Sequence, residues 1–158
     1  MSADALVEEL KIRARVRLNT ARREGRAGAS MLRDQLHAAA REIGFSDWEH
    51  ARLVLSGRAE PGDDQGSFWH APRTGMLLHI WCSSHAEALA LQARQPGDFL
   101  LPYRRQCFIV KTPFITALGL DVADAAWSDI GYDLVAGYGS PAWCRLAWQR
   151  LRSPLSGF

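Results

Sequence analysis

The spacing of apolar residues changes clearly at the segment GRAEPGDDQGS of this 158-residue chain. Upstream of it, apolar residues recur every three or four positions, as they do along a helix with one buried face. Downstream, they come in short runs separated by Gly, Pro and polar residues, a pattern typical of strands that alternate with helices. We therefore predict an α+β protein, with an N-terminal three-helix element followed by a small, mainly antiparallel sheet covered by helices. The corresponding division is a helical module at residues 1–57, a linker at 58–67 and an α+β domain at 68–158.

Local signals place the ends of the N-terminal helices. The first apolar stripe predicts a helix over residues 4–23 and consists of Leu6, Leu10, Ala14, Leu18 and Ala21. Ser30 is the expected N-cap of the second helix, and Gly44 is expected to end it, because glycine adopts a positive φ at little cost. Ser46 and Glu49 form an S-x-x-E capping box, which predicts a third helix that runs to about residue 56.

The strands are predicted from short apolar runs in the second half of the chain. Phe68–His70 and Met76–Cys82 are expected to form a hairpin joined by APRTG. FLLPY and CFIVK predict two further strands, with RRQ as the turn between them. Pro102 in the first of these favours an edge position, because proline has no N–H to donate to a neighbouring strand.

Helix starts in the second half follow the same capping rules. Ser84 and Glu87 form a second capping box, and Thr112 and Ser140 each stand before a proline as expected N-caps. Between the last two starts, an apolar stripe predicts a further helix and consists of Ala123, Trp127, Ile130 and Leu134. The last helix has a broad apolar arc, which we expect to pack against the sheet or, alternatively, to form a dimer interface.

Positive charge is concentrated in one segment, although the net charge of the chain is only +2. Residues 11–33 contain eight Lys and Arg residues against one acidic residue, Glu24. A second basic segment is the predicted turn PYRRQ, whose guanidinium groups and tyrosine suit a phosphate, a carboxylate or a base. Each segment is either an ordinary solvated surface or a site for an acidic partner. The candidate binding residues are Arg13, Arg15, Arg17, Arg22, Tyr103, Arg104 and Arg105.

The stretch HAAAREIGFSDWEHARLVLSG, residues 37–57, fits two different roles. A small residue four positions before Gly44 is the spacing of a helix–turn–helix that reads DNA. Asp47 and Glu49, however, would face phosphates with like charge at the start of the second helix. We therefore favour a structural role, in which Trp48 packs against a partner helix.

Part of this stretch, LRDQLHAAAREIGFSDWEHA, resembles a helical module with a Gly-Phe/Tyr-x-x-Trp signature found at the N-terminus of bacterial glyoxalase-related proteins. The resemblance covers roughly residues 30–56 and rests on Gly44, Phe45, Trp48 and Ala51. It implies a bacterial protein with a packing unit that sits beside an unrelated partner domain. It implies no glyoxalase activity, because the metal ligands of true glyoxalases have no counterpart in this sequence.

A few histidines and one cysteine are the residues best suited to metal binding or catalysis. HIWCSSH places His79, Cys82 and His85 three residues apart, and zinc sites use these residue types. On a strand, His79 and Cys82 would point to opposite faces, so we predict no metal site and no cofactor. An alternative is a small hydrolase or nuclease that uses His70, His79 or His85 with Arg104 as an anion clamp. Since no G-x-S-x-G motif is present, we favour a protein without catalytic activity.

Composition narrows the expected location and partners. No apolar run approaches the ~20 residues that span a bilayer, and the N-terminus lacks the apolar stretch of a signal peptide. We therefore expect a cytoplasmic protein with no membrane partner, in agreement with three cysteines that match no disulfide framework. The favoured hypothesis is a non-enzymatic binding module that recognises a protein partner through a basic helical surface. Nucleic-acid binding through the first helix is the main alternative, and a homodimer is a further one.

Overall fold

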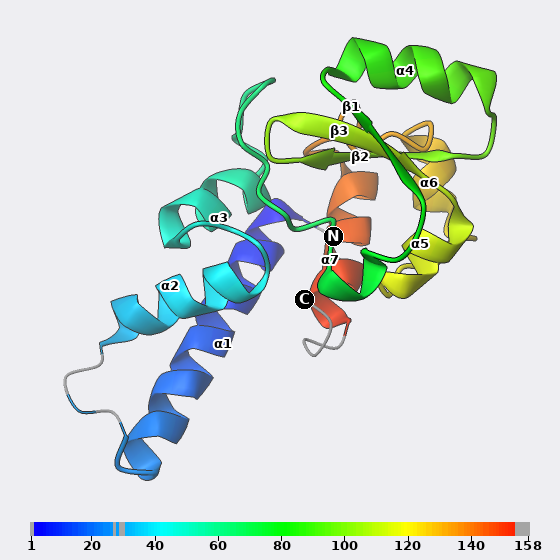
Figure 1. The fold of residues 1–158 in the computed structure, drawn as a ribbon. Coiled ribbons are helices and arrows are strands. Elements are labelled where there is room, and N and C mark those ends of the chain that lie inside the picture. The colour runs from blue at the N-terminus through cyan, green and yellow to red at the C-terminus, as the bar shows by residue number, and fades with distance from the viewer. Residues whose placement is uncertain (1, 27, 29–30, 154–158) are drawn as a thin grey trace.

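The computed structural model describes residues 2–26, 28 and 31–153 (Figure 1). Its elements are, in order, α1 (Ala3–Arg23), α2 (Leu32–Glu42), α3 (Trp48–Leu55), the 3-10 turn η1 (Pro72–Thr74), β1 (His79–Cys82), α4 (His85–Arg94), β2 (Phe99–Tyr103), β3 (Gln106–Val110), α5 (Thr112–Ala117), α6 (Ala125–Asp129) and α7 (Pro141–Arg152). The predicted α+β class is confirmed, because the N-terminal helices precede a small antiparallel sheet that has helices on both faces.

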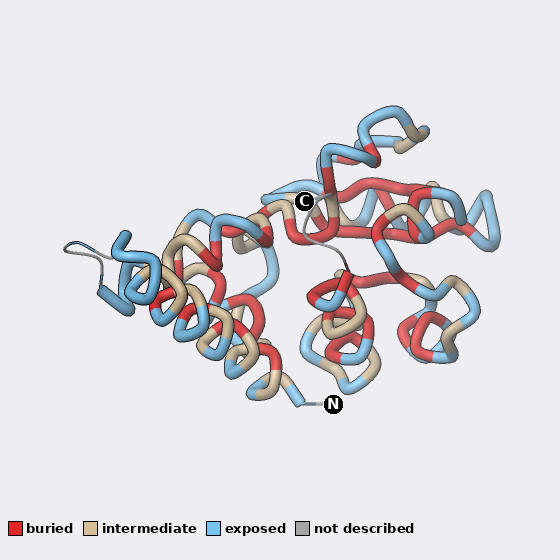
Figure 2. Tube along the Cα trace, turned by 90° about the horizontal axis from the view of Figure 1, so that it is seen from below, coloured by how far each residue is buried: buried red, intermediate tan, exposed pale blue. Residues whose placement is uncertain are grey.

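The N-terminal helices pack around the apolar stripe that the sequence predicts. Leu6, Leu10 and Ala14 are buried on one side of α1, and Figure 2 shows buried positions recurring along this side. Trp48 at the start of α3 is buried in the same core, and its backbone N–H donates to Nδ1 of His37 in α2 at 3.0 Å. The packing role predicted for Trp48 is therefore confirmed.

The turn between α2 and α3 confirms one expected residue and corrects another. Gly44 has φ +100°, and a Cβ there would lie 2.7 Å from the backbone of Ser67, so both the conformation and the close approach require glycine. The predicted Ser46 cap is wrong, because Asp47 is the N-cap of α3 and its carboxylate accepts a backbone N–H of the first turn. Ser30, the expected cap of α2, lies outside the described residues.

Within the described residues, the sheet has three strands in the order β1-β3-β2, and each neighbouring pair is antiparallel. Pro102 lies in β2, at an edge of the sheet, as predicted. The face toward α4 carries Cys82, Leu100, Cys107 and Ile109, which form a small buried cluster with a residue of α4. The opposite face joins the main core, to which α1, α3, α5, α6 and α7 also contribute.

The segment predicted to be the first strand of a hairpin, Phe68–His70, is not a strand. Its carbonyl groups accept hydrogen bonds from the buried Arg150 of α7, which donates Nε–H to Phe68 at 2.9 Å and Nη2–H to His70 at 3.3 Å. The turn η1 follows, and β1 begins only at His79. The run FWH is apolar because Phe68 and Trp69 are inserted into the core, and a short apolar run of this kind cannot be told from a strand by periodicity.

Two of the predicted helix starts are confirmed. The Ser84 hydroxyl accepts the backbone N–H of Glu87, and the Ser140 hydroxyl accepts that of Trp143, each at 3.1 Å. The second half of the Ser84 capping box differs from the expectation, because the Glu87 carboxylate accepts from the backbone of Ser83 at 2.9 Å.

The two helix predictions between β3 and α7 need correction. Thr112 is the first residue of α5 rather than its cap, and Lys111 precedes the helix. The stripe predicted over residues 123–134 forms only the five-residue α6, because the chain turns away at Gly131 and Tyr132, both of which have positive φ.

The N-terminal helices and the sheet share one continuous core. Buried residues of α1 and α3 belong to the same cluster as those of β2, β3 and α7, and Arg13 of α1 donates a hydrogen bond to the carbonyl of Leu151 in α7 at 2.6 Å. The apolar arc of α7 is buried within the chain, with Trp143 and Leu146 fully enclosed, so it does not offer the predicted dimer interface. Among the described residues, no helix combines the length and the apolar character needed to cross a membrane.

Candidate functional site

The predicted basic residues of α1 are largely engaged within the chain. Arg13 pairs with Glu9 at 3.0 Å in addition to its bond to α7, and Arg15 pairs with Glu8 at 3.4 Å. Arg17 forms an ion pair with Glu42 at the C-terminal end of α2, while Arg22 is exposed in the last turn of α1. The charge of this helix is therefore partly compensated by its own carboxylates and by α2.

The segment predicted as a linker, residues 58–67, is fastened at both ends and is called the strap below. The backbone of Gln65 donates to the Arg104 carbonyl at 2.9 Å, and the Arg104 N–H donates to Gly66 at 2.8 Å, so the strap lies along the β2–β3 turn. Ser67 donates to the Gly44 carbonyl at 2.8 Å, which ties the strap to the end of α2. Arg105 also contacts the strap, because its Nη1 donates to Gly62 at 3.0 Å.

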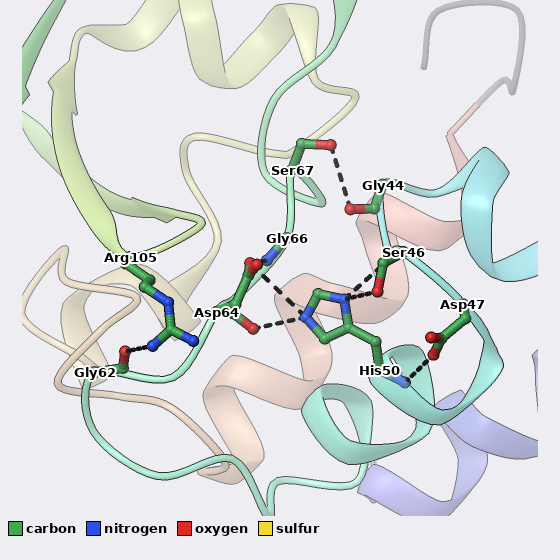
Figure 3. A network of polar contacts seen from close by, with 9 residues as sticks. All are labelled: Gly44, Ser46, Asp47, His50, Gly62, Asp64, Gly66, Ser67 and Arg105. Atoms are coloured by element: carbon green, nitrogen blue, oxygen red, sulfur yellow. Dashed lines mark hydrogen bonds and ion pairs between the residues drawn. The ribbon is translucent and has the colours of Figure 1, made fainter.

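His50 of α3 holds the strap from the other side (Figure 3). Its Nδ1 accepts the backbone N–H of Ser46 at 3.1 Å, which leaves Nε2 to donate to the carbonyl of Asp64 at 2.7 Å. Asp64 in turn accepts the N–H of Gly66 at 2.7 Å. This network fixes the β2–β3 turn, and with it Arg104, relative to the N-terminal helices.

Four partly exposed rings meet on the face of the sheet opposite α4: His70, His79, Trp81 and Tyr103, called the aromatic cluster below. Neighbouring ring centroids are 5.6 Å apart for His70 and His79, 5.3 Å for His79 and Trp81, 5.0 Å for Trp81 and Tyr103, and 5.5 Å for Tyr103 and His70. All four surround Phe108, which is fully buried and within 6.4 Å of each ring centroid. The cluster thus consists of four partly exposed rings around the buried side chain of Phe108.

Strand register explains why these rings meet. Trp81 lies directly opposite Phe108, and His79 stands two residues before Trp81 on the same face of β1. Tyr103 stands two residues after Leu101, the partner of Phe108 in β2, and so lies diagonal to Phe108. His70 is not on a strand and reaches the cluster from the segment that Arg150 holds.

The imidazoles of His70 and His79 lie in different surroundings. Nδ1 of His79 donates to the carbonyl of Leu77 at 2.6 Å, which leaves Nε2 as an acceptor in the neutral ring. For His70, burial lowers the pKa below its ordinary value of 6.5, and the nearby His79 and Arg150 lower it further. His70 is therefore neutral at pH 7 and able to accept a hydrogen bond.

A groove, called the junction groove below, separates the aromatic cluster from the end of α2. It consists of two adjoining hollows of about 520 Å³ and 400 Å³, both lined by Arg41 and Ser67. The larger hollow is also lined by His70, Tyr103 and Glu42, which pairs with Arg17, and the smaller one by Arg104 and Asp64. Within the described part of the chain, neither Arg41 nor Arg104 forms an ion pair, and the Arg104 guanidinium lies 5.4 Å from the centroid of the Tyr103 ring.

The third histidine considered from the sequence lies elsewhere. Nε2 of His85 contacts the buried carboxylate of Asp133 at 2.7 Å, on the side of the sheet covered by α4. His85 lines a separate cavity of about 400 Å³ together with Arg104 and Arg105. His79 and Cys82 lie on opposite faces of β1, so the structure does not gather His79, Cys82 and His85 into one set of ligands.

Sequence reasoning found Tyr103 and Arg104 but missed the rings that surround them. Trp81 and Arg41 were not among the candidates, and His70 and His79 were considered only for catalysis or metal binding. The motif H-x-W places two rings on one face of a strand, which is a usable signal. Arg41 comes from a different helix, and no local pattern could have placed it beside Tyr103.

Comparison of the chain with protein-family models, curated proteins and solved structures finds no match. The resemblance of residues 30–56 to the glyoxalase-related helical module therefore stays a prediction.

Proposed function

We propose that this is a cytoplasmic nucleic-acid-binding protein that holds a single strand on the aromatic cluster and along the junction groove. The observation that carries the proposal is the position of Trp81, which is 44% exposed beside Tyr103, whose ring in turn lies 5.4 Å from the Arg104 guanidinium. Bases of a single strand stack on exposed aromatic faces, while arginines bind the phosphates between them. Arg41 on the opposite side of the groove supplies a second phosphate contact.

A single strand fits these contacts better than a duplex does. Stacking on Trp81 requires bases whose faces are free, and the bases of a duplex are already stacked on one another. The helix that would enter a major groove, α3, buries Trp48 and begins with Asp47 and Glu49. This arrangement disfavours phosphate contact at the start of α3.

The geometry gives less support to a protein partner bound through α1. Arg13, Arg15 and Arg17 already have carboxylate partners within the chain. An acidic partner would have to compete with those carboxylates, whereas Arg41 and Arg104 are available.

Fluorescence anisotropy with labelled oligonucleotides tests the proposal. We expect the protein to bind oligo(dT) or oligo(U) more tightly than a duplex of the same length, with affinity that falls as salt is raised. Trp81→Ala should weaken binding about fivefold or more, because one stacked base contributes about 1–3 kcal/mol. Arg104→Gln should weaken binding and lower the salt slope by about one.

The chain offers a matched control on α7. Trp148 is also partly exposed, and the Arg152 guanidinium lies 5.7 Å from its ring centroid, so this pair has the same chemistry at a different place. Trp148→Ala and Arg152→Gln should leave affinity unchanged. Equal losses at both pairs, or tight binding of the duplex alone, would contradict the proposed site.

One observation favours a second candidate, the hydrolase alternative. His85, which contacts Asp133, lines a cavity together with Arg104 and Arg105, which is the arrangement of a general base beside an anion clamp. Hydrolysis of p-nitrophenyl phosphate or p-nitrophenyl acetate that is lost in His85→Gln and kept in His37→Gln would support this function. Absence of turnover with both esters would remove it.

A further inference from the structure

The two edge strands of the sheet differ in whether another segment pairs with their outer side. The outer edge of β2 is covered, because Leu100 donates to the Tyr132 carbonyl at 2.9 Å and accepts from the N–H of Leu134 at 2.9 Å. β1 forms the opposite edge and pairs with β3. In the described ranges of the chain, no further segment pairs with the outer side of β1, so alternate N–H and C=O groups of this strand face outward.

This bare edge is also apolar. Large side chains along it are strongly exposed: 96% for Met76, 69% for Leu78, 36% for Ile80 and 44% for Trp81. Proteins usually protect free edges with charge, proline or a covering segment, and none of these protects β1 among the residues that the structure describes.

The charge pattern indicates what occupies this edge. The sequence from Thr74 to Ala86 contains no Asp, Glu, Lys or Arg. A second copy of the same uncharged strand therefore meets no like charge when it aligns antiparallel, whereas strands that carry charge would have to bury it. Antiparallel pairing of a strand with itself is also the arrangement that twofold symmetry produces.

We propose that β1 pairs with β1 of a second copy of this chain, across a twofold axis, to form a homodimer with one continuous sheet. The backbone groups of the two edges then satisfy each other, and Leu78 and Ile80 of each copy are covered by the other. The dimer surface is thus the β1 edge rather than α7.

The symmetry has a consequence for the aromatic cluster. A twofold axis between antiparallel strands stands perpendicular to the sheet, so the same face of both copies points the same way. Trp81 and His79 of the two copies would lie side by side and form one longer stacking surface. This consequence for ligand binding rests on the proposed function, whereas the dimer itself does not.

Sedimentation velocity of the full chain without nucleic acid tests the dimer. We expect the mass to rise from the monomer value of 17.6 kDa toward twice that value as concentration increases. Leu78→Lys should keep the protein monomeric, because it places a charge at each end of the interface, where Leu78 would otherwise be covered by the other copy. Val16→Lys, at a residue 56% exposed on α1, is the matched control and should leave the dimer intact.

Hydrogen exchange locates the interface independently of any substitution. The outward-facing amides of residues 79–82 should become more protected as concentration rises, while those of β3 in the sheet interior stay unchanged. A monomer that persists to about 1 mM, the weak end of specific association, would overturn the proposal. So would a dimer that Leu78→Lys leaves intact, or protection that rises on another element. Because no nucleic acid is present, failure here leaves the proposed function untouched.

Discussion

The two faces of the sheet are built from alternate residues of the same strands and yet have different properties. The face toward α4 carries Cys82, Leu100, Cys107 and Ile109, and it is closed. Burial raises the pKa of the Cys107 thiol to about 11, with smaller contributions from the nearby Asp133 and Cys82, so this thiol stays protonated and unreactive. The opposite face carries aromatic rings, and one of them, Trp81, is exposed to solvent.

The difference shows where a small sheet can hold a ligand. A face covered by a helix serves stability, because its apolar side chains are buried beneath α4. A face that is only partly covered leaves some aromatic rings exposed. Such rings can stack on a ligand, while the ring that they surround, here Phe108, stays buried.

The largest expected effect is the loss of Arg150, which fixes the segment that carries His70 to the open face. Arg150→Met removes the donors that satisfy the carbonyls of Phe68 and His70, and we expect a loss of about 3–5 kcal/mol in the free energy of unfolding. Urea denaturation measures it. Arg145→Met is the control on the same helix, because Arg145 is exposed and pairs with Asp124, and it should cost less than about 1 kcal/mol.

A pair of truncations compares the faces directly. Leu100→Ala on the closed face should cost about 2–5 kcal/mol, because it leaves a cavity under α4. Trp81→Ala on the open face removes a larger side chain but should cost only about 1 kcal/mol, because that ring is 44% exposed. The urea midpoints of the two variants measure these two losses in stability. Similar losses would show that the open face is as tightly packed as the α4 face.

The smallest expected effect is a pH dependence at the open face. The pKa of His70 is lowered in the folded state, so the unfolded chain binds a proton first as the pH falls below about 6.5. The free energy of unfolding should therefore decrease between pH 6.5 and the lower folded-state pKa. His70→Gln should remove this part of the slope in urea titrations at several pH values. A slope that is unchanged in the variant would assign the effect to another group.

Sequence patterns predicted the fold well where local chemistry is decisive. The stripe of α1, the positive φ of Gly44, the caps Ser84 and Ser140, and the edge position of Pro102 all follow from spacing or from backbone limits of single residues. The failure at residues 68–70 arises because a distant residue replaces a local partner. Arg150 takes the carbonyls of the FWH run, so a segment that reads as a strand forms turns instead.

The candidate site was predicted only in part for the same reason. PYRRQ is recognisable as an exposed basic and aromatic turn, and the structure places it between two hollows. Arg13, Arg15 and Arg17 of α1 looked equally suitable in the sequence, but they have carboxylate partners in their own helix and in α2. Whether a basic residue is available depends on its neighbours in space, which spacing along the chain does not specify.

The sequence by itself determined the helical start, the α+β class and the identity of the strands β2 and β3, because hydrophobic period, capping and turn chemistry act over a few residues. Only the tertiary structure decided which rings converge around Phe108, which arginines are compensated and which sheet edge is left bare. Those features depend on contacts between residues tens of positions apart. The environment of each side chain there is set by tertiary packing and not by its neighbours in sequence.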